Sequence, residues 1–198
     1  RREQDGVSDS TINRDLALLK VSLNSAVDDG LMFINHIKKV KKLKDNNKRD
    51  RIMSIDEEKQ FMNTVSEHLR NIVNFILNTG LRINEVLGLK WPDVNFNNQT
   101  ATIRKTKNGK DFTFPLNKTA LNLLNSLRQD KVLNFYVFTF KGQKLKSIRT
   151  AFENTCERAK ITGLHIHDLR KTFATRLLNS GVDIHTISKL LNHSDIQM

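Results

Sequence analysis

The side chains best suited to chemistry lie near the C-terminal end of the sequence, where a histidine and an arginine are three residues apart. His167 and Arg170 stand in a segment whose apolar residues recur at helical spacing, so both side chains are expected on one helical face. An imidazole and a guanidinium on one face suit the non-bridging oxygens of a phosphodiester, which arginine can bind bidentately. A second histidine, His193, follows a short helix expected after Gly181, so that one phosphate could meet all three groups. On spacing alone, a solvated pair on an amphipathic helix is the commoner arrangement.

A further cationic position, Arg82, comes two residues after Gly80, which is expected to end a helix. Arg82 would therefore lie at the start of the next helix, where the helix dipole disfavours a cation. That placement suggests a bound anion or a carboxylate partner. Glu85, three residues further on, is the candidate partner that could hold the guanidinium in position.

The apolar pattern predicts a mainly helical scaffold for these groups. Ser54 and Glu57 form a capping-box pattern, so a helix and a domain are expected to begin there. After Trp91 the period changes to that of short strands, and Asn108-Gly109 is typical of a type I′ hairpin turn. Helices are expected over 10–29 (capped by Asp9 or Ser10 and ended by Gly30), from Ser54, over 70–78, from Arg82 to Trp91, around 121–127 and 146–159, from His167 to Gly181, and over 184–192. The predicted fold is therefore mainly α (α+β), with a small antiparallel sheet.

The composition favours a polyanionic partner. The chain has 33 Lys and Arg against 21 Asp and Glu, a formal net charge of +12 and a pI near 10.0. The basic residues are interleaved with ordinary apolar periodicity, which indicates a folded nucleic-acid binder rather than a basic tail. The lone Cys156 excludes an internal disulfide and is expected in the core. No segment has the length of a membrane span, and no signal peptide is recognisable.

Residues 38–51 form a strongly basic stretch with only two aspartates. Either this stretch is a solvated linker, or its lysines contact DNA phosphates as well. The two interpretations are about equally favoured. The candidate DNA-binding lysines here are Lys41, Lys42 and Lys44.

Two long motifs, TGLRINEVLGL at 79–89 and HDLRKTFATRLLNSGVDIHTISKLLNHS at 167–194, resemble the tyrosine recombinase family, the phage-integrase type of site-specific DNA recombinase. The resemblance covers about residues 8–198. It implies the end of a helical core-binding domain plus the basic linker at 1–50, and a catalytic domain at 51–198. The sequence departs from the family at Asn192, where glycine is usual, and at Lys171, where histidine is frequent.

The resemblance also implies roles for individual residues. Arg82 and Arg170 would bind the scissile phosphate, with Glu85 supporting them. His167 and His193 would donate hydrogen bonds and exchange protons, with unperturbed pKa values near ~6.5. A lysine of the β-hairpin would protonate the leaving 5′-oxygen. Counting back from Pro115 favours Lys107, with Lys105 as the second candidate and Lys105 and Lys110 as DNA contacts.

The family's nucleophilic tyrosine lies roughly nine residues after the second histidine, which falls beyond Met198. The single tyrosine of the sequence, Tyr136, is in a short apolar run and is expected to be a packed core or edge residue. This piece of chain is therefore expected to bind DNA without forming the covalent intermediate. A zinc site built from His165, His167 and His185 or His193 is the competing interpretation of the histidines, but no cysteine pair or acidic cluster completes it.

The implied function is breaking and rejoining of double-stranded DNA at specific sites, for integration or excision of a phage or mobile element. A chromosome-dimer resolvase and a DNA-binding regulator without catalysis are the alternatives. No ATP, metal or other cofactor is expected, because a phosphotyrosyl linkage keeps the energy of the cleaved bond. The full-length partners would be DNA and other protomers in a tetrameric synapse, in a prokaryotic cytoplasm at the nucleoid, whereas the piece itself is predicted to be monomeric.

Overall fold

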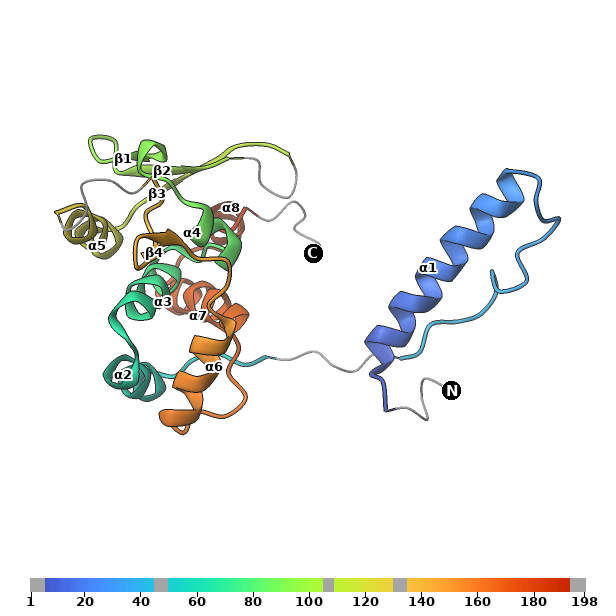
Figure 1. Ribbon diagram of the computed structural model, residues 1–198, viewed down its shortest axis with the longest axis horizontal. Coiled ribbons are helices and arrows are strands. Elements are labelled where there is room, and N and C mark those ends of the chain that lie inside the picture. Colours follow the sequence, from blue (N-terminus) through green and yellow to red (C-terminus); the bar gives the residue numbers. More distant parts are fainter. Residues whose placement is uncertain (1–5, 45–49, 105–108, 130–134, 193–198) are drawn as a thin grey trace. The chain divides into compact units, whose positions relative to one another are not determined.

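The computed structural model describes residues 6–44, 50–104, 109–129 and 135–192. The chain divides into two compact units, Arg1–Asp50 and Arg51–Met198 (Figure 1). The mainly α fold with small antiparallel sheets confirms the predicted fold class. No helix in the described ranges has the length and apolar character needed to cross a membrane.

The first unit consists of one long helix and a segment that runs back along it. Helix α1 spans Asp9–Asp28, and its N-cap is Ser8 rather than the expected Asp9 or Ser10. Ser8 has extended backbone angles, while Asp9 already lies in the first helical turn. The chain turns at Gly30, which has a positive φ of 72°.

Hydrogen bonds hold the returning segment to α1 at residues 40 and 43. The side-chain amide of Asn13 donates to the carbonyl oxygen of Leu43 at 2.9 Å and accepts from its N–H at 2.7 Å. Lys20 donates from Nζ to the carbonyl oxygen of Val40 at 2.5 Å. The backbone of this segment is therefore tied to α1, while the side chains of the candidate lysines Lys41, Lys42 and Lys44 remain exposed.

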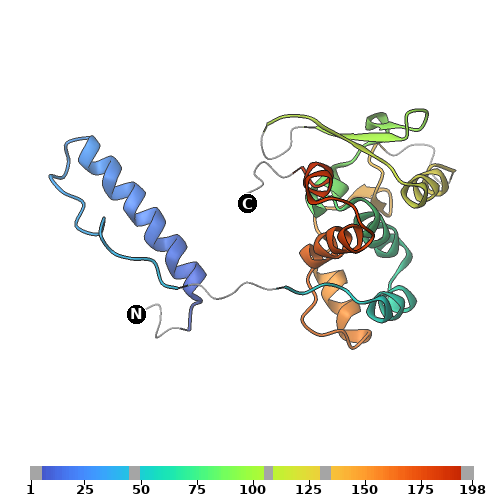
Figure 2. The same cartoon turned by 180° about the vertical axis from the view of Figure 1, so that it is seen from behind.

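The second unit is built around helix α3, Glu67–Thr79, which is buried on nearly all sides. Figures 1 and 2 show α3 among the other helices of the unit, with the three-stranded sheet at one end. The predicted capping box is confirmed, because Ser54 Oγ accepts from the N–H of Glu57 and the Glu57 carboxylate accepts from the N–H of Ser54. The remaining helices are α2 (Ile55–Thr64), α4 (Ile83–Gly88), the 3-10 turn η1 (Trp91–Asp93), α5 (Lys118–Gln129), α6 (Arg149–Arg158), α7 (Ile166–Asn179) and α8 (Ile184–Leu190).

The strands form two small antiparallel sheets. The first has the order β1-β2-β3, with bounds Val94–Asn95, Thr100–Ile103 and Phe112–Pro115. Ala101 pairs with Phe114, and both face the core, so alternation along β2 and β3 buries one side of the sheet. The second sheet pairs β4 (Thr139–Phe140) with β5 (Gln143–Lys144). Cys156 is buried, as predicted, and burial raises the pKa of its thiol to about 11.

Candidate active site

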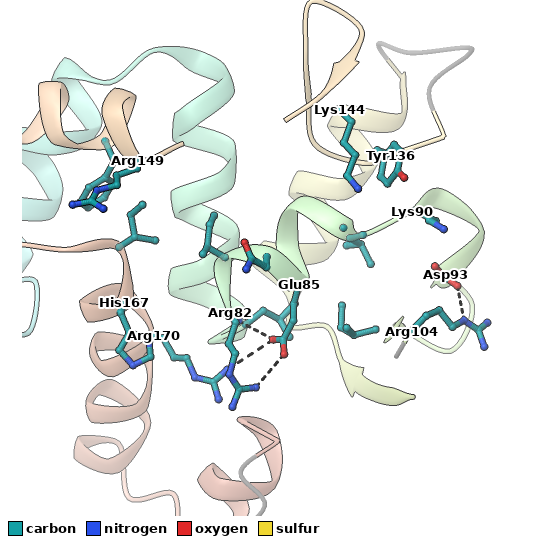
Figure 3. Close-up of a pocket in the computed structure, with 18 of the residues that line it drawn as sticks. Arg82, Glu85, Lys90, Asp93, Arg104, Tyr136, Lys144, Arg149, His167 and Arg170 are labelled. Atoms are coloured by element: carbon teal, nitrogen blue, oxygen red, sulfur yellow. Dashed lines mark hydrogen bonds and ion pairs between the residues drawn. The ribbon is translucent and has the colours of Figure 1, made fainter. Parts of the chain in front are cut away.

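A cleft of about 1080 Å³ in the second unit brings four of the sequence-predicted groups together, Arg82, Glu85, His167 and Arg170 (Figure 3). It lies between α4, the sheet β1-β2-β3, the start of α6 and the start of α7. Six cationic side chains line it against three carboxylates: Arg82, Lys90, Arg104, Lys144, Arg149 and Arg170 against Glu85, Asp93 and Glu153. The excess of positive charge suits a polyanion.

Arg82 lies at the junction of two helices, as its position after Gly80 predicted. Helix α3 ends at Gly80, which adopts the left-handed conformation with φ 66°, and Arg82 is the N-cap of α4. The backbone N–H of Arg82 donates to Glu85 Oε2 at 2.8 Å, and Arg82 Nη1 donates to Glu85 Oε1 at 3.0 Å. One carboxylate therefore satisfies a free N–H of the helix end and fixes the guanidinium in the cleft.

Arg170 is a buried cation, with only 4% of its surface exposed. Its Nη1 donates to the carbonyl oxygen of Gly80 at 2.8 Å and lies 4.0 Å from Glu85 Oε2, and its Nη2 donates to the carbonyl oxygen of Leu191. Burial, and then the charge of Arg82, lower the pKa of Arg170 to about 10, so the group stays charged at neutral pH. A solvated pair on a helix surface is thus excluded. Two guanidinium groups share one carboxylate, which leaves positive charge for an anion.

His167 starts the same helix as Arg170 and faces the cleft, but unlike Arg170 it is exposed. Partial burial lowers the pKa of His167, and the charges of Arg170, Lys171 and Arg82 lower it further. The expectation of an unperturbed pKa near ~6.5 is therefore wrong for His167. The lowered pKa favours the neutral imidazole, which can donate one hydrogen bond. A bound phosphate would raise this pKa by offsetting the nearby positive charges.

Three predicted groups, Lys105, Lys107 and His193, lie outside the described residues. Lys110 is described and exposed. At the base of the hairpin, Arg104 Nε donates to Asp93 Oδ1 at 2.9 Å and Arg104 Nη1 donates to Asp111 Oδ2 at 2.8 Å. The ends of β2 and β3 are therefore joined to η1 by ion pairs.

Asn192, the departure from the family's usual glycine, has a positive φ of 47°. Among residues with a side chain, asparagine tolerates the left-handed conformation comparatively well. The turn after α8 therefore keeps the backbone conformation that glycine would favour. The carbonyl oxygen of the preceding Leu191 is held by Arg170, which links this turn to the arginine site.

The other end of the cleft was not predicted from the sequence. Lys90, Tyr136 and Lys144 line it there, and Tyr136 is half-buried in a short β-bridge, which fits the expected edge residue rather than a core residue. These residues meet because the segment around Lys90 pairs with the segment around Tyr136. No local motif signals a contact between segments so far apart in the sequence.

Among the described residues, the histidines form no recognisable metal site. Within the part of the chain that the structure describes, no three His, Cys, Asp or Glu side chains are grouped so that they could hold a metal ion. The candidate ligand His193 lies outside that part.

Comparisons to known proteins show the family of the chain. The model of the phage integrase family matches residues 45–198, and the chain belongs to this family. It is 35% identical over 149 residues to tyrosine recombinase XerA of Pyrococcus horikoshii, covering 71% of this chain and 52% of the relative. It is 28% identical over 197 residues to the shufflon-specific DNA recombinase of Escherichia coli, covering 97% of this chain and 50% of the relative. The chain thus spans about half the length of these relatives.

Solved structures show the same fold. The Tn1549 transposon integrase, in complex with circular intermediate DNA, superposes with a TM-score of 0.81 at 20% identity, covering 99% of this chain and 75% of that one. A lambda integrase dimer bound to a COC′ core site superposes with a TM-score of 0.80 at 18% identity, covering 100% of this chain and 59% of that one. The expectation of a tyrosine recombinase fold is confirmed.

Proposed function

We propose that this chain is the end of a core-binding domain, at 1–50, joined to most of the catalytic domain of a tyrosine-type site-specific recombinase, at 51–198, which breaks and rejoins double-stranded DNA. The observation that carries the proposal is the group of Arg82, Arg170 and Glu85 at one end of a positively charged cleft, with His167 beside it. The nucleophile would be a tyrosine encoded after Met198, about four residues on.

In this mechanism the tyrosine hydroxyl gives its proton to one of the two histidines, His167 or His193, as its oxygen attacks the scissile phosphorus. The bond to the 5′-oxygen breaks, leaving a 3′-phosphotyrosyl linkage. The two guanidinium groups stabilise the charge that gathers on the non-bridging oxygens. Because Glu85 and two backbone carbonyls hold the arginines before DNA arrives, little reorganisation is needed. His167 donates a hydrogen bond to the same phosphate, and Lys107 protonates the leaving oxygen. Attack of the freed 5′-hydroxyl on the linkage reverses the step and rejoins a strand.

The proposed partners are duplex DNA and, for strand exchange, further protomers of the complete protein. A regulator without catalysis is not favoured, because both arginines, the glutamate and the histidine occupy one cleft. Integration or excision of a mobile element is the proposed role.

A trapping experiment tests the reaction. The complete protein is incubated with a duplex that is nicked just downstream of the cleavage site. Cleavage then releases a short fragment that carries the 5′-hydroxyl, this fragment diffuses away, and the covalent intermediate accumulates. The expected product is a covalent protein–DNA adduct attached through tyrosine at a 3′-phosphate. Duplex binding without an adduct on any nicked target would contradict the proposal.

A further inference from the structure

The far end of the cleft carries positive charge that the arginine site does not use. Figure 3 shows Lys90, Tyr136 and Lys144 together, apart from the group of Arg82, Glu85 and Arg170. Backbone pairing creates this arrangement: the N–H of Trp91 donates to the carbonyl oxygen of Phe135 at 3.1 Å, and Lys90 and Tyr136 form a β-bridge.

The hairpin of β4 and β5 supplies the second lysine. Its turn residues, Lys141 and Gly142, both have positive φ, at 49° and 77°, and Phe140 pairs with Gln143. Such a tight two-residue turn fixes the register of the hairpin. As a result, Lys144 Nζ lies 4.5 Å from the centre of the Tyr136 ring.

Both ammonium groups are held by aromatic rings. Lys90 Nζ is 5.9 Å from the centre of the Tyr136 ring and 4.8 Å from that of Phe135. A ring face attracts a cation and restricts its position without neutralising its charge. The ring contacts therefore position the two lysines without supplying a negative charge beside them.

The other cations of the cleft are compensated differently. Arg82 pairs with Glu85, Arg104 with Asp93, and Arg149 with Glu153. In the described ranges, by contrast, Lys90 and Lys144 have ring contacts and no ion pair with a carboxylate. Two uncompensated ammonium groups on one ring suit an anion placed between them.

We infer that Lys90 and Lys144, positioned by the ring of Tyr136, form a second phosphate-binding subsite, which holds the DNA backbone away from the scissile phosphate. This inference rests on the proposed function. Lysine suits such a contact as a point charge, whereas the bidentate arginines hold the reacting phosphate. The subsite adds affinity and alignment and takes no part in bond breaking.

The salt dependence of DNA binding tests the subsite. Each phosphate contact contributes about 0.9 to the slope of log K against log salt, so Lys90→Gln with Lys144→Gln, which removes the one phosphate contact of the subsite, should reduce the slope by roughly 0.9 on a short duplex of arbitrary sequence. Lys141→Gln is the matched control. Lys141 is on the same hairpin and lies over the Phe140 ring at 5.6 Å, but it lines a different pocket. The slope of log K against log salt for the Lys141→Gln variant should equal that of the unsubstituted chain.

Substitution of the ring separates positioning from charge. Tyr136→Phe keeps the ring and should bind as the unsubstituted chain does. Tyr136→Leu keeps both lysines but removes the ring under Lys144 and leaves Lys90 only its contact with Phe135, so affinity should fall about two- to five-fold with the slope nearly unchanged. Fluorescence of Trp91, the single tryptophan, checks that each variant remains folded.

The outcomes distinguish the two claims. Steep salt dependence in the unsubstituted chain, with the double lysine variant matching Lys141→Gln, would overturn the subsite and leave the proposed function standing. A chain whose duplex binding hardly depends on salt would overturn both.

Discussion

Replacing Gly80 by alanine should destabilise the second unit more than its backbone conformation alone explains. A Cβ built on Gly80 lies 2.3 Å from Phe173 Cδ1 and 2.7 Å from Leu191 Cδ2, and both of these side chains are buried. The left-handed conformation costs an L-residue about 1–2 kcal/mol, and overpacking of a core adds about 1–3 kcal/mol. The sum is roughly 2–5 kcal/mol.

Gly142→Ala is the matched control, because Gly142 has a φ of 77° but nothing lies within 4 Å of its built Cβ. Gly142→Ala should lower the free energy of unfolding only by the cost of the left-handed conformation, about 1–2 kcal/mol. Urea unfolding of both variants, followed by Trp91 fluorescence, reports on the second unit alone, since the first unit has no tryptophan. Equal losses of unfolding free energy would refute the close packing around Gly80.

Three further predictions concern the leaving group, the basic segment and pH. In the complete protein, Lys107→Ala should lose cleavage of ordinary DNA but regain it on a substrate with a bridging sulfur, which needs no proton; rescue of Lys105→Ala instead would move the general acid by two residues. Neutralising Lys41, Lys42 and Lys44 together should flatten the salt dependence of duplex binding, and an unchanged slope would mean that these exposed side chains are merely solvated. The bond from Arg51, and then backbone hydrogen bonding at Ser54, lower the pKa of Glu57 to about 2 from 4.5, so its contribution to stability is complete above pH 4.5 and is lost as the pH falls towards 2. Urea unfolding across that range should show that the unsubstituted chain loses its excess free energy of unfolding over the Glu57→Gln variant as the pH falls. A difference in unfolding free energy that stays constant would contradict this prediction.

The sequence predicted the parts of the fold that short-range signals determine. The capping box at Ser54 and the left-handed Gly80 each follow from a few neighbouring residues. The pairing of Arg82 with Glu85 was predictable for the same reason, since both lie on one helical turn.

Long-range contacts account for what the sequence did not predict. Arg170 bonds to the carbonyl oxygen of Gly80, 90 residues away in the chain, and no pattern indicates that this cation is buried. The bridge between Lys90 and Tyr136 is likewise set by tertiary packing. The lowered pKa of His167 follows from those same placements, because it depends on burial and on the positions of Arg170 and Arg82.

The central claim is that Arg82 and Arg170 act on one scissile phosphate, and the most direct measurement compares adduct formation with binding in the same samples. In the complete protein, Arg82→Ala and Arg170→Ala should each slow adduct formation on the nicked duplex by about 10²–10³, the usual effect of losing one preorganised donor. Duplex affinity should change little, because each arginine meets one phosphate among many contacts. Adduct formation at the unsubstituted rate in either variant, or a loss of adduct that merely follows a loss of binding, would contradict the claim.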